Sequence, residues 1–136
     1  MKILVTGAAG FIGFHTAKLL LERSDEVVGL DNLNEYYDVT LKHARLDVLK
    51  RQKNFKFVKL DLADREGMAK LFAAEKFARV IHLGAQAGVR YSIQAPFTYI
   101  DSNIQGTLTV LEGFRHNGVE HLVFASTSSV YGANTK

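Results

Sequence analysis

Thr6-Gly7-Ala8-Ala9-Gly10-Phe11-Ile12-Gly13 is the stretch that decides the fold, because it joins an apolar run to the start of a helical pattern. The apolar run before it, Ile3-Leu4-Val5, is typical of a strand that is buried on both faces. Glycine permits a tight turn at the first position and close packing of a helix on a strand at the third. The stretch therefore predicts a strand, a glycine turn and a helix, in that order.

Short apolar runs and longer helical stretches alternate along the rest of the chain. The apolar runs are continuous pairs and triples, which favour a parallel sheet covered by helices. Because parallel neighbours need crossovers that are almost always right-handed, we predict a doubly wound, Rossmann-type α/β sheet with helices on both faces. Strands are expected at 2–6, 26–31, 55–61, 79–83 and 121–126, and helices at about 11–23, 39–52, 65–75 and 95–117.

The last of these helices carries the clearest periodic pattern. Pro96 stands in its first turn, where the missing N–H costs nothing, and Gly118 follows its end. Apolar residues at three- and four-residue spacing form one stripe along it, namely Phe97, Ile100, Ile104, Leu108 and Leu111.

Composition excludes several classes of protein. With 136 residues, 47% of them apolar and 23% charged, the chain is suited to one globular domain. No apolar run approaches the roughly 18 residues that span a bilayer, and no signal-peptide layout precedes the first strand, so we expect a cytoplasmic protein without a membrane partner. The absence of cysteine excludes disulfides, thiol catalysis and zinc-cysteine sites. The short basic run at 50–53 does not indicate nucleic-acid binding.

The glycine turn and the acid at the end of the second strand together indicate a dinucleotide. Gly10 lets the backbone approach a pyrophosphate, and the unpaired N–H groups at the helix start bind it. Asp31, 18 residues beyond Gly13, can accept hydrogen bonds from the adenosine ribose and would repel a 2′-phosphate. Asn32-Leu33-Asn34 offers no arginine for an extra phosphate. We therefore expect NAD rather than NADP, the alternative being a glycine-rich turn without a ligand.

Two further motifs stand at the ends of strands, at the same carboxyl edge of the predicted sheet. Asp61-Leu62 follows the third strand, and His82-Leu83-Gly84-Ala85 follows the fourth. Ligands of doubly wound sheets bind at this edge. Asp61 could instead cap the helix that begins near Arg65. We interpret His82 as a packed or hydrogen-bonded histidine rather than a catalyst, because no acidic partner stands near it in sequence.

Six motifs in this order resemble the extended short-chain dehydrogenase/reductases that act on nucleotide sugars, the NAD-dependent epimerase/dehydratase family. Segments 31–38, 41–46 and 87–92 look most like those of the UDP-glucuronate 4-epimerases. The motifs are Thr-Gly-x-x-Gly-x-x-Gly at 6–13, Asp31-Asn32, Asp61-Leu62, His82-Leu83-Gly84-Ala85-Gln86-Ala87, Ser102-Asn103-x-x-Gly106-Thr107 and Ser126-Thr127-Ser128-Ser129-Val130-Tyr131-Gly132.

The resemblance implies reversible hydride transfer between NAD and C4 of a UDP-sugar, with a tyrosine base and a lysine four residues after it. It assigns the catalytic hydroxyl to Thr127. We also expect Arg90 to face a substrate carboxylate or phosphate, and Ser128 to contact the substrate. The cofactor contacts that it implies, together with those from the glycine turn, are Gly7, Gly10, Phe11, Ile12, Gly13, Asp31, Asn32, Asp61, Leu62, Leu83, Gly84, Ala85, Asn103 and Ser126.

Simpler interpretations remain for the hydroxyl loop and for Arg90. Serine and threonine also gather in turns because their hydroxyls cap the local backbone, which is the alternative for Thr127. Arg90 could be a solvated surface residue. Dehydratases of the family carry acids after the threonine, since eliminating water needs a general acid and base. Ser128-Ser129 therefore favours simple inversion at C4.

The family's Tyr-x-x-x-Lys would fall beyond the last residue of this chain. Tyr131 and Lys136 do not replace it, because five residues place two side chains on different faces of a helix. We therefore expect residues 1–136 to be an NAD-binding domain, truncated before the catalytic pair and the substrate lobe, that lacks turnover alone. An apolar edge at the fifth strand predicts a homo-oligomer. The alternatives are a non-catalytic NAD-sensing module and a nucleotide-sugar dehydratase or reductase.

Overall fold

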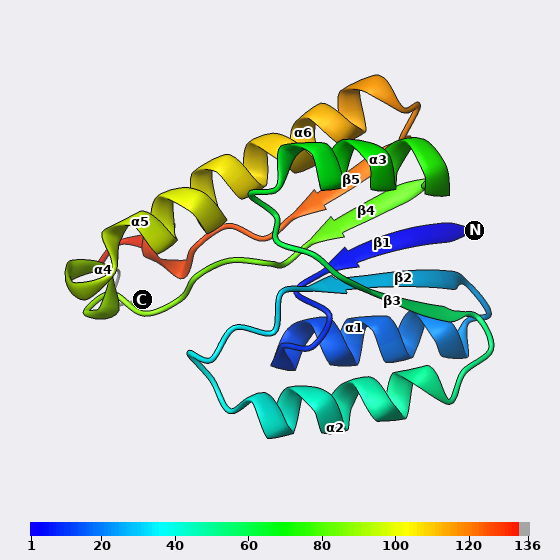
Figure 1. The fold of residues 1–136 in the computed structure, drawn as a ribbon, viewed down its shortest axis with the longest axis horizontal. Helices are drawn as coiled ribbons and strands as arrows, with labels where there is room; N and C mark the ends of the chain where they lie inside the picture. Colours follow the sequence, from blue (N-terminus) through cyan, green and yellow to red (C-terminus); the bar gives the residue numbers. More distant parts are fainter. Residues whose placement is uncertain (134–136) are drawn as a thin grey trace.

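Parallel strands form one sheet at the centre of the computed structural model, which describes residues 1–133 (Figure 1). The sheet has five strands in the order β3-β2-β1-β4-β5, so the doubly wound α/β fold predicted from the sequence is confirmed. β1 and β2 have the predicted bounds. The strands are β1 (Lys2–Thr6), β2 (Glu26–Asp31), β3 (Phe55–Lys59), β4 (Arg79–His82) and β5 (His121–Phe124).

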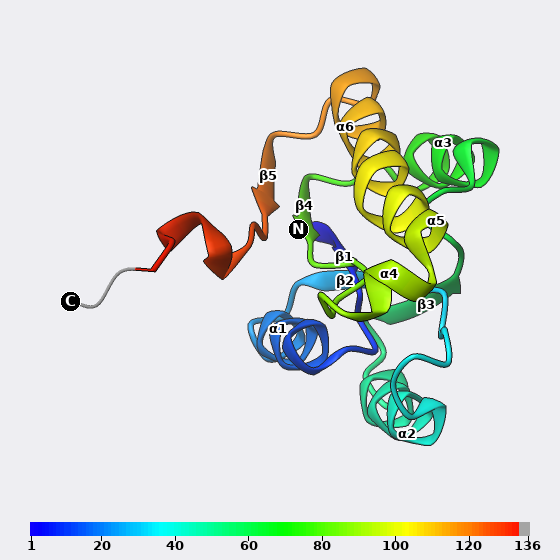
Figure 2. The ribbon, with the colours of Figure 1, turned by 90° about the vertical axis from the view of Figure 1, so that its left-hand side faces the viewer.

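Helices cover both faces of the sheet, as Figure 2 shows. On one face lie α1 (Phe11–Glu22) and α2 (Val39–Lys50), and on the other α3 (Arg65–Glu75) and α6 (Gly106–His116). Because side chains alternate along a strand, β1 supplies both cores: Ile3 and Val5 join one cluster, and Leu4 joins the other. Each such fully buried side chain contributes about 1.5–3 kcal/mol of hydrophobic stabilisation.

β3 ends earlier than the sequence predicts. It stops at Lys59, although the Leu60 N–H still donates to the Asp31 carbonyl oxygen at 3.2 Å. The chain then turns, and the carboxylate of Asp61 accepts the N–H of Ala63 at 2.9 Å. This side chain offers the backbone a partner outside the ladder, which explains why the strand does not continue to residue 61.

The helix predicted at 95–117 is a composite. A short helix that the sequence did not predict, α4 (Tyr91–Gln94), precedes it. The predicted span then contains α5 (Pro96–Tyr99), the π-helical segment η1 (Ile100–Gln105) and α6. Within η1 the carbonyl oxygen of Asn103 accepts the Thr107 hydroxyl at 2.7 Å. Such wide turns place side chains in directions that a regular α-helix cannot reach.

The apolar stripe on this composite helix faces outward. Phe97 is 80% exposed and Ile104 62% exposed. The buried face consists instead of Gly106, Thr109, Val110 and Gly113. A Cβ at Gly113 would lie 2.4 Å from the ring of Phe72 on α3, so the small residues are what allow close approach. Periodicity located the stripe correctly but could not tell which helix face meets the body of the protein.

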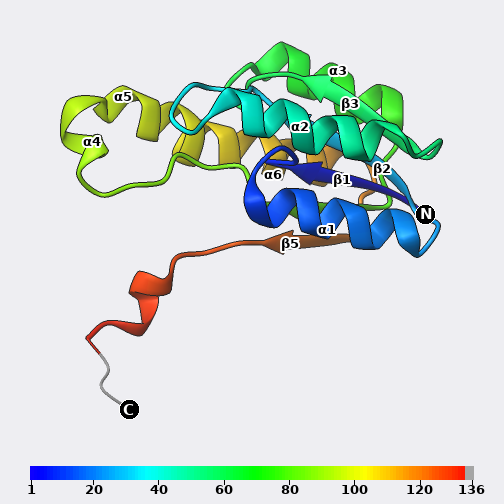
Figure 3. The same ribbon diagram turned by 90° about the horizontal axis from the view of Figure 1, so that it is seen from below.

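β5 is an edge strand, and the chain leaves the sheet after it. Val123 and Phe124 are 47% and 52% exposed. From Ala125 onward the described chain runs away from the sheet and forms the short 3₁₀ helix η2 (Ser128–Tyr131), as Figures 2 and 3 show. Lys136, which the sequence interpretation compared with Tyr131, lies outside the described residues. In the described part, no helix has the length and apolarity to cross a membrane.

Candidate functional site

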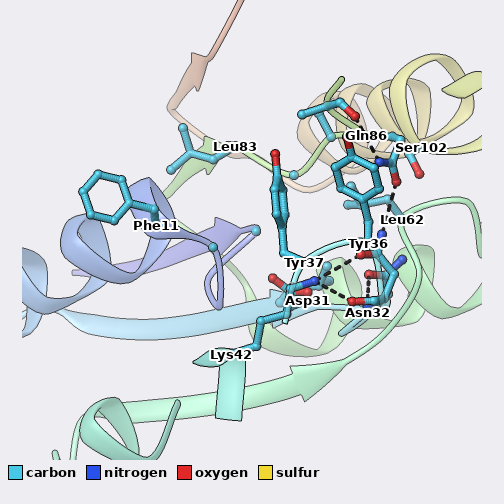
Figure 4. Close-up of a pocket in the computed structure, with 18 of the residues that line it drawn as sticks. Phe11, Asp31, Asn32, Tyr36, Tyr37, Lys42, Leu62, Leu83, Gln86 and Ser102 are labelled. Carbon is cyan, nitrogen blue, oxygen red and sulfur yellow. Dashed lines mark hydrogen bonds between the residues drawn. The ribbon is translucent and has the colours of Figure 1, made fainter. Parts of the chain in front are cut away.

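A cleft of about 740 Å³ opens at the carboxyl ends of the strands (Figure 4). Phe11 on α1 lies at one end of it, and Tyr36, Tyr37 and Gln86 lie toward the other. The cleft brings together twelve of the residues predicted to bind a cofactor: Gly7, Gly10, Phe11, Ile12, Gly13, Asp31, Asn32, Asp61, Leu62, Leu83, Gly84 and Ala85.

The glycine turn forms the floor of the cleft between β1 and α1. Gly7 has φ = 70°, which an L side chain adopts only with strain, and its carbonyl oxygen accepts the Gly10 N–H at 3.0 Å. A Cβ at Gly13 would lie 1.9 Å from that same oxygen. Within residues 1–133 no side chain caps α1 at Gly10. The N–H groups of its first turn are therefore presented to the cleft, as an anion requires.

Asp31 stands opposite this turn at the end of β2. One carboxylate oxygen accepts the Ala9 N–H at 3.1 Å, and the other accepts the Leu33 N–H at 2.9 Å. Each carboxylate oxygen has about two acceptor sites, so each retains one for a further donor such as a ribose hydroxyl. The side chain is thus fixed at the cleft wall without losing its capacity to bind.

Two basic residues of α2 line the cleft beside Asp31, and the sequence interpretation missed them. Lys42 donates from Nζ to the Asn34 carbonyl oxygen at 2.7 Å and to Asn34 Oδ1 at 3.1 Å. Arg45 donates to the Ala9 carbonyl oxygen at 3.0 Å. The sequence signal for these two residues is the three-residue spacing of Lys42 and Arg45, which places both on one face of α2.

Tyrosine rings join the loop after β2 to the loop after β4. The rings of Tyr36 and Tyr37 meet edge to face at 4.7 Å, and Tyr36 also lies 4.8 Å from Tyr91. Gly88, with φ = 97°, packs against Tyr36 so closely that a Cβ there would lie 2.2 Å from the Tyr36 hydroxyl. Contacts between the two loops therefore close this end of the cleft.

Asn103 holds the loop after β4 from behind. Its Oδ1 accepts the Gln86 N–H at 2.8 Å, and its Nδ2 donates to the Gln86 carbonyl oxygen at 3.1 Å. Gln86 in turn accepts a hydrogen bond on Oε1 from Asn34 at 3.3 Å. Asn103 was predicted to contact the cofactor, but its amide is occupied by the backbone of Gln86, while its neighbour Ser102 lines the cleft. The π-helical turn accounts for the direction in which Asn103 points.

His82 lies behind the cleft, 3% exposed, with Nδ1 2.7 Å from the Thr6 hydroxyl. Burial lowers the pKa of His82 to about 4. The interpretation of this residue as a hydrogen-bonded histidine rather than a catalyst agrees with this position.

A family model described as GDP-mannose 4,6 dehydratase matches residues 4–136. The chain belongs to the GDP-mannose 4,6 dehydratase family. The relationship to nucleotide-sugar enzymes predicted from the six motifs is thereby confirmed.

Relatives of this GDP-mannose 4,6 dehydratase family member include an uncharacterized 37.6 kDa protein of Escherichia coli O111:H-, 60% identical over the whole chain. A UDP-glucuronate 4-epimerase of Thermodesulfobacterium geofontis is 48% identical over 97% of the chain. The structure of UDP-glucuronic acid 4-epimerase from Bacillus cereus in complex with UDP-glucuronic acid and NAD superposes on all of the chain with a TM-score of 0.89 and 38% identity. The chain spans 40%, 41% and 43% of these three proteins, respectively.

The remaining predicted residues of this family member lie outside the cleft lining. Of the segment 125–133, Ala125 reaches the cleft, whereas Ser126, Thr127 and Ser128 are exposed beyond it. The Thr127 hydroxyl accepts the Ser129 N–H at 3.1 Å, which is the local capping role that the sequence left open. Arg90 is exposed at the start of α4. Catalytic and substrate roles for these residues stay predictions.

Proposed function

We propose that the chain is the NAD-binding part of a nucleotide-sugar 4-epimerase that interconverts UDP-glucuronate and UDP-galacturonate. The observation that carries the proposal is the pairing of two features across one cleft, the uncapped start of α1 and the fixed carboxylate of Asp31. Family membership and the solved NAD complex of the Bacillus cereus relative support it.

The residues present fit the cofactor. In the proposed arrangement, the N–H groups of Phe11, Ile12 and Gly13 bind the pyrophosphate, and Asp31 accepts the hydroxyls of the adenosine ribose. Bound NAD would supply a hydride acceptor for C4 of the sugar and then return the hydride. Asp31 also disfavours a 2′-phosphate by charge repulsion, which supports NAD over NADP.

Fewer residues of this chain are proposed to contact the substrate than to contact the cofactor. We propose that the Thr127 hydroxyl binds a sugar oxygen and that Arg90 and Ser128 contact the nucleotide sugar. The side chains after Thr127 are Ser128 and Ser129, and neither supplies the acid that elimination of water needs, so inversion is favoured over dehydration.

We propose further that these 136 residues, taken as one NAD-binding domain, have no turnover. A base of the family type is a tyrosine with a lysine four residues after it. The residues four positions after the five tyrosines are Thr40, Leu41, Ala95, Asn103 and Thr135. Without a positioned base the proton of the sugar hydroxyl has no acceptor, and hydride transfer stalls.

We propose that copies of the chain associate with one another through β5. This strand pairs with β4 on one edge, and Val123 and Phe124 are about half exposed. Unpaired strand edges favour pairing with another copy. Sedimentation velocity over a range of concentrations should show a rising mass, and a constant monomer mass would refute this part of the proposal.

Isothermal calorimetry of the purified chain with NAD, NADP and UDP-glucuronate tests the proposed function. NAD should bind and NADP should bind at least tenfold more weakly. An assay for UDP-galacturonate should detect no product from the chain itself. Tighter binding of NADP than of NAD would refute the role of Asp31. Epimerase turnover would refute the proposal that these 136 residues contain no catalytic base.

A further inference from the structure

His82 occupies a central place behind the cleft. It is the last residue of β4, and the strand register places it between Thr6 of β1 and Phe124 of β5. Its ring stacks on Phe124 with centroids 5.9 Å apart. Its two nitrogens face two threonine hydroxyls, those of Thr6 and Thr107. The ring therefore connects elements that are far apart in sequence.

The hydrogen bonds of Thr6 determine what one ring nitrogen does. Thr6 Oγ1 accepts the N–H of Leu83 at 3.0 Å and the N–H of Gly84 at 2.9 Å. A hydroxyl has two acceptor sites and one proton, so both acceptor sites are filled. Its proton must then be donated to His82 Nδ1, which lies 2.7 Å away. This requires Nδ1 to be unprotonated.

The hydrogen bonds of Thr107 determine the state of the other nitrogen independently. The Thr107 hydroxyl donates its proton to the Asn103 carbonyl oxygen at 2.7 Å. Its oxygen, 3.3 Å from His82 Nε2, is therefore left as an acceptor for a proton on that nitrogen. Both ends of the chain of hydrogen bonds require the same neutral ring, with its proton on Nε2.

We propose that His82 is a positioning residue of the cofactor site: as a neutral ring protonated on Nε2, it ties the glycine turn to α6 and fixes the loop after β4. Through Thr6 it sets the backbone of Leu83 and Gly84, which line the cleft. Through Thr107 it reaches Asn103, which holds Gln86.

The glycine turn depends on this loop being in place. A Cβ at Gly7 would lie 3.0 Å from the Gly84 nitrogen, so the two backbones are in direct contact. A shift of Gly84 therefore moves the turn that presents the α1 amides. The buried position of the ring, which lowers the pKa of His82 to about 4, is consistent with a neutral histidine near pH 7.

The protonation state of the ring is tested by NMR of the chain labelled with ¹⁵N-histidine. The His82 signals are assigned by their loss in His82→Gln. We expect the Nδ1 resonance of an unprotonated ring nitrogen and the Nε2 resonance of a protonated one near pH 7. The opposite tautomer, an averaged pair of resonances or a doubly protonated ring would overturn the inference. This measurement does not depend on NAD binding.

The positioning role rests on the proposed function and is tested by NAD affinity in two variants. His82→Asn keeps an oxygen near Nδ1 that can accept the Thr6 hydroxyl, whereas His82→Gln keeps a donor near Nε2 but removes that acceptor. We expect NAD affinity within about threefold of wild type for His82→Asn and a loss of about tenfold for His82→Gln, equivalent to about 1.4 kcal/mol. The control His121→Gln changes an exposed histidine of β5 and should leave affinity unchanged.

Each outcome decides the question. Equal losses in both His82 variants would assign the residue to packing alone and overturn the positioning role, as would unchanged affinity in both. A wild-type chain that does not bind NAD would refute the proposed function, and the ring-nitrogen measurement would then decide the inference by itself.

Discussion

Ala9 donates its backbone N–H to the carboxylate of Asp31 at 3.1 Å, so the acid at the end of β2 is bonded directly to the glycine turn after β1. The two parts of the candidate site that are proposed to bind phosphate and ribose are therefore joined by a direct hydrogen bond. A change at either residue should alter both.

Replacing Asp31 with serine should weaken NAD and strengthen NADP. The substitution removes the proposed ribose acceptor and the negative charge that would repel a 2′-phosphate, while Lys42 and Arg45 remain at the same wall. We expect NAD affinity to fall about tenfold, or about 1.4 kcal/mol, by calorimetry. Asp47→Ser, on the exposed side of α2, is the control for the loss of one negative charge. An Asp31→Ser chain that still excludes NADP would contradict the assignment.

Gly13→Ala should destabilise the protein strongly. Its Cβ would lie 1.9 Å from the Gly7 carbonyl oxygen, and backbone must move to accept it. We expect a loss of at least about 2 kcal/mol in the free energy of unfolding, at the upper end of overpacking effects. Gly118→Ala is the control, because its φ of 66° is strained but the space around it is open among the described residues. Urea denaturation that ranks the two variants in the opposite order would refute the packing role of Gly13.

Asn103→Asp should loosen the loop after β4. A carboxylate cannot donate to the Gln86 carbonyl oxygen, which loses its partner at 3.1 Å and faces a negative charge instead. Breaking such a pair costs about 1–3 kcal/mol. Faster amide hydrogen exchange at residues 84–88 is the expected result. Ser102→Ala, one residue earlier, should leave that exchange unchanged, and an equal effect of both would argue against a specific clamp.

Stability should fall as the pH drops from about 6.5 to about 4, because of His82. Burial lowers the pKa of His82 in the folded state, so within this window the unfolded chain binds a proton that the folded chain does not. Thr6 and Thr107 face the ring nitrogens and Phe124 stacks on the ring, and none of these three side chains titrates in this range. The contribution lost is on the order of 3 kcal/mol.

Urea denaturation of wild type and His82→Asn at several pH values measures this contribution. The variant should lose the part of the pH dependence that falls between pH 4 and 6.5. Identical pH profiles for the two proteins would show that His82 does not titrate in this window.

Shortening a side chain should change the stability of the protein differently on the two faces of the composite helix. Val110 is fully buried, and Val110→Ala should cost about 1–3 kcal/mol of stability. Ile104 is 62% exposed, and Ile104→Ala should change stability by less than about 0.5 kcal/mol. Thermal denaturation of both variants distinguishes this packing from one in which the apolar stripe faces the core, where Ile104→Ala would be the costlier change.

The sequence predicts correctly those strands and helices whose signals lie within the element itself. Continuous apolar runs located β1 and β2 to the residue, and the glycine spacing located the start of α1. Their order along the chain then implied the sheet, because right-handed crossovers leave few arrangements.

The parts that could not be predicted depend on tertiary contacts. In the π-helical turn at 100–105, Asn103 bonds to the loop after β4, and Thr107 just beyond it faces His82; no periodicity reveals these contacts. Lys42 and Arg45 reach the cleft only because α2 packs against α1 and β3. The outward direction of the Phe97–Leu111 stripe follows from the small residues that α6 presents to Phe72.

Amide chemical-shift mapping with NAD tests the central claim most directly. The account predicts that added NAD shifts the backbone N–H resonances of Gly10, Phe11, Ile12 and Gly13 together with that of Leu33, whose amide bonds to Asp31. Shifts confined to other surfaces, with the amides of residues 10–13 unmoved at saturating NAD, would contradict it.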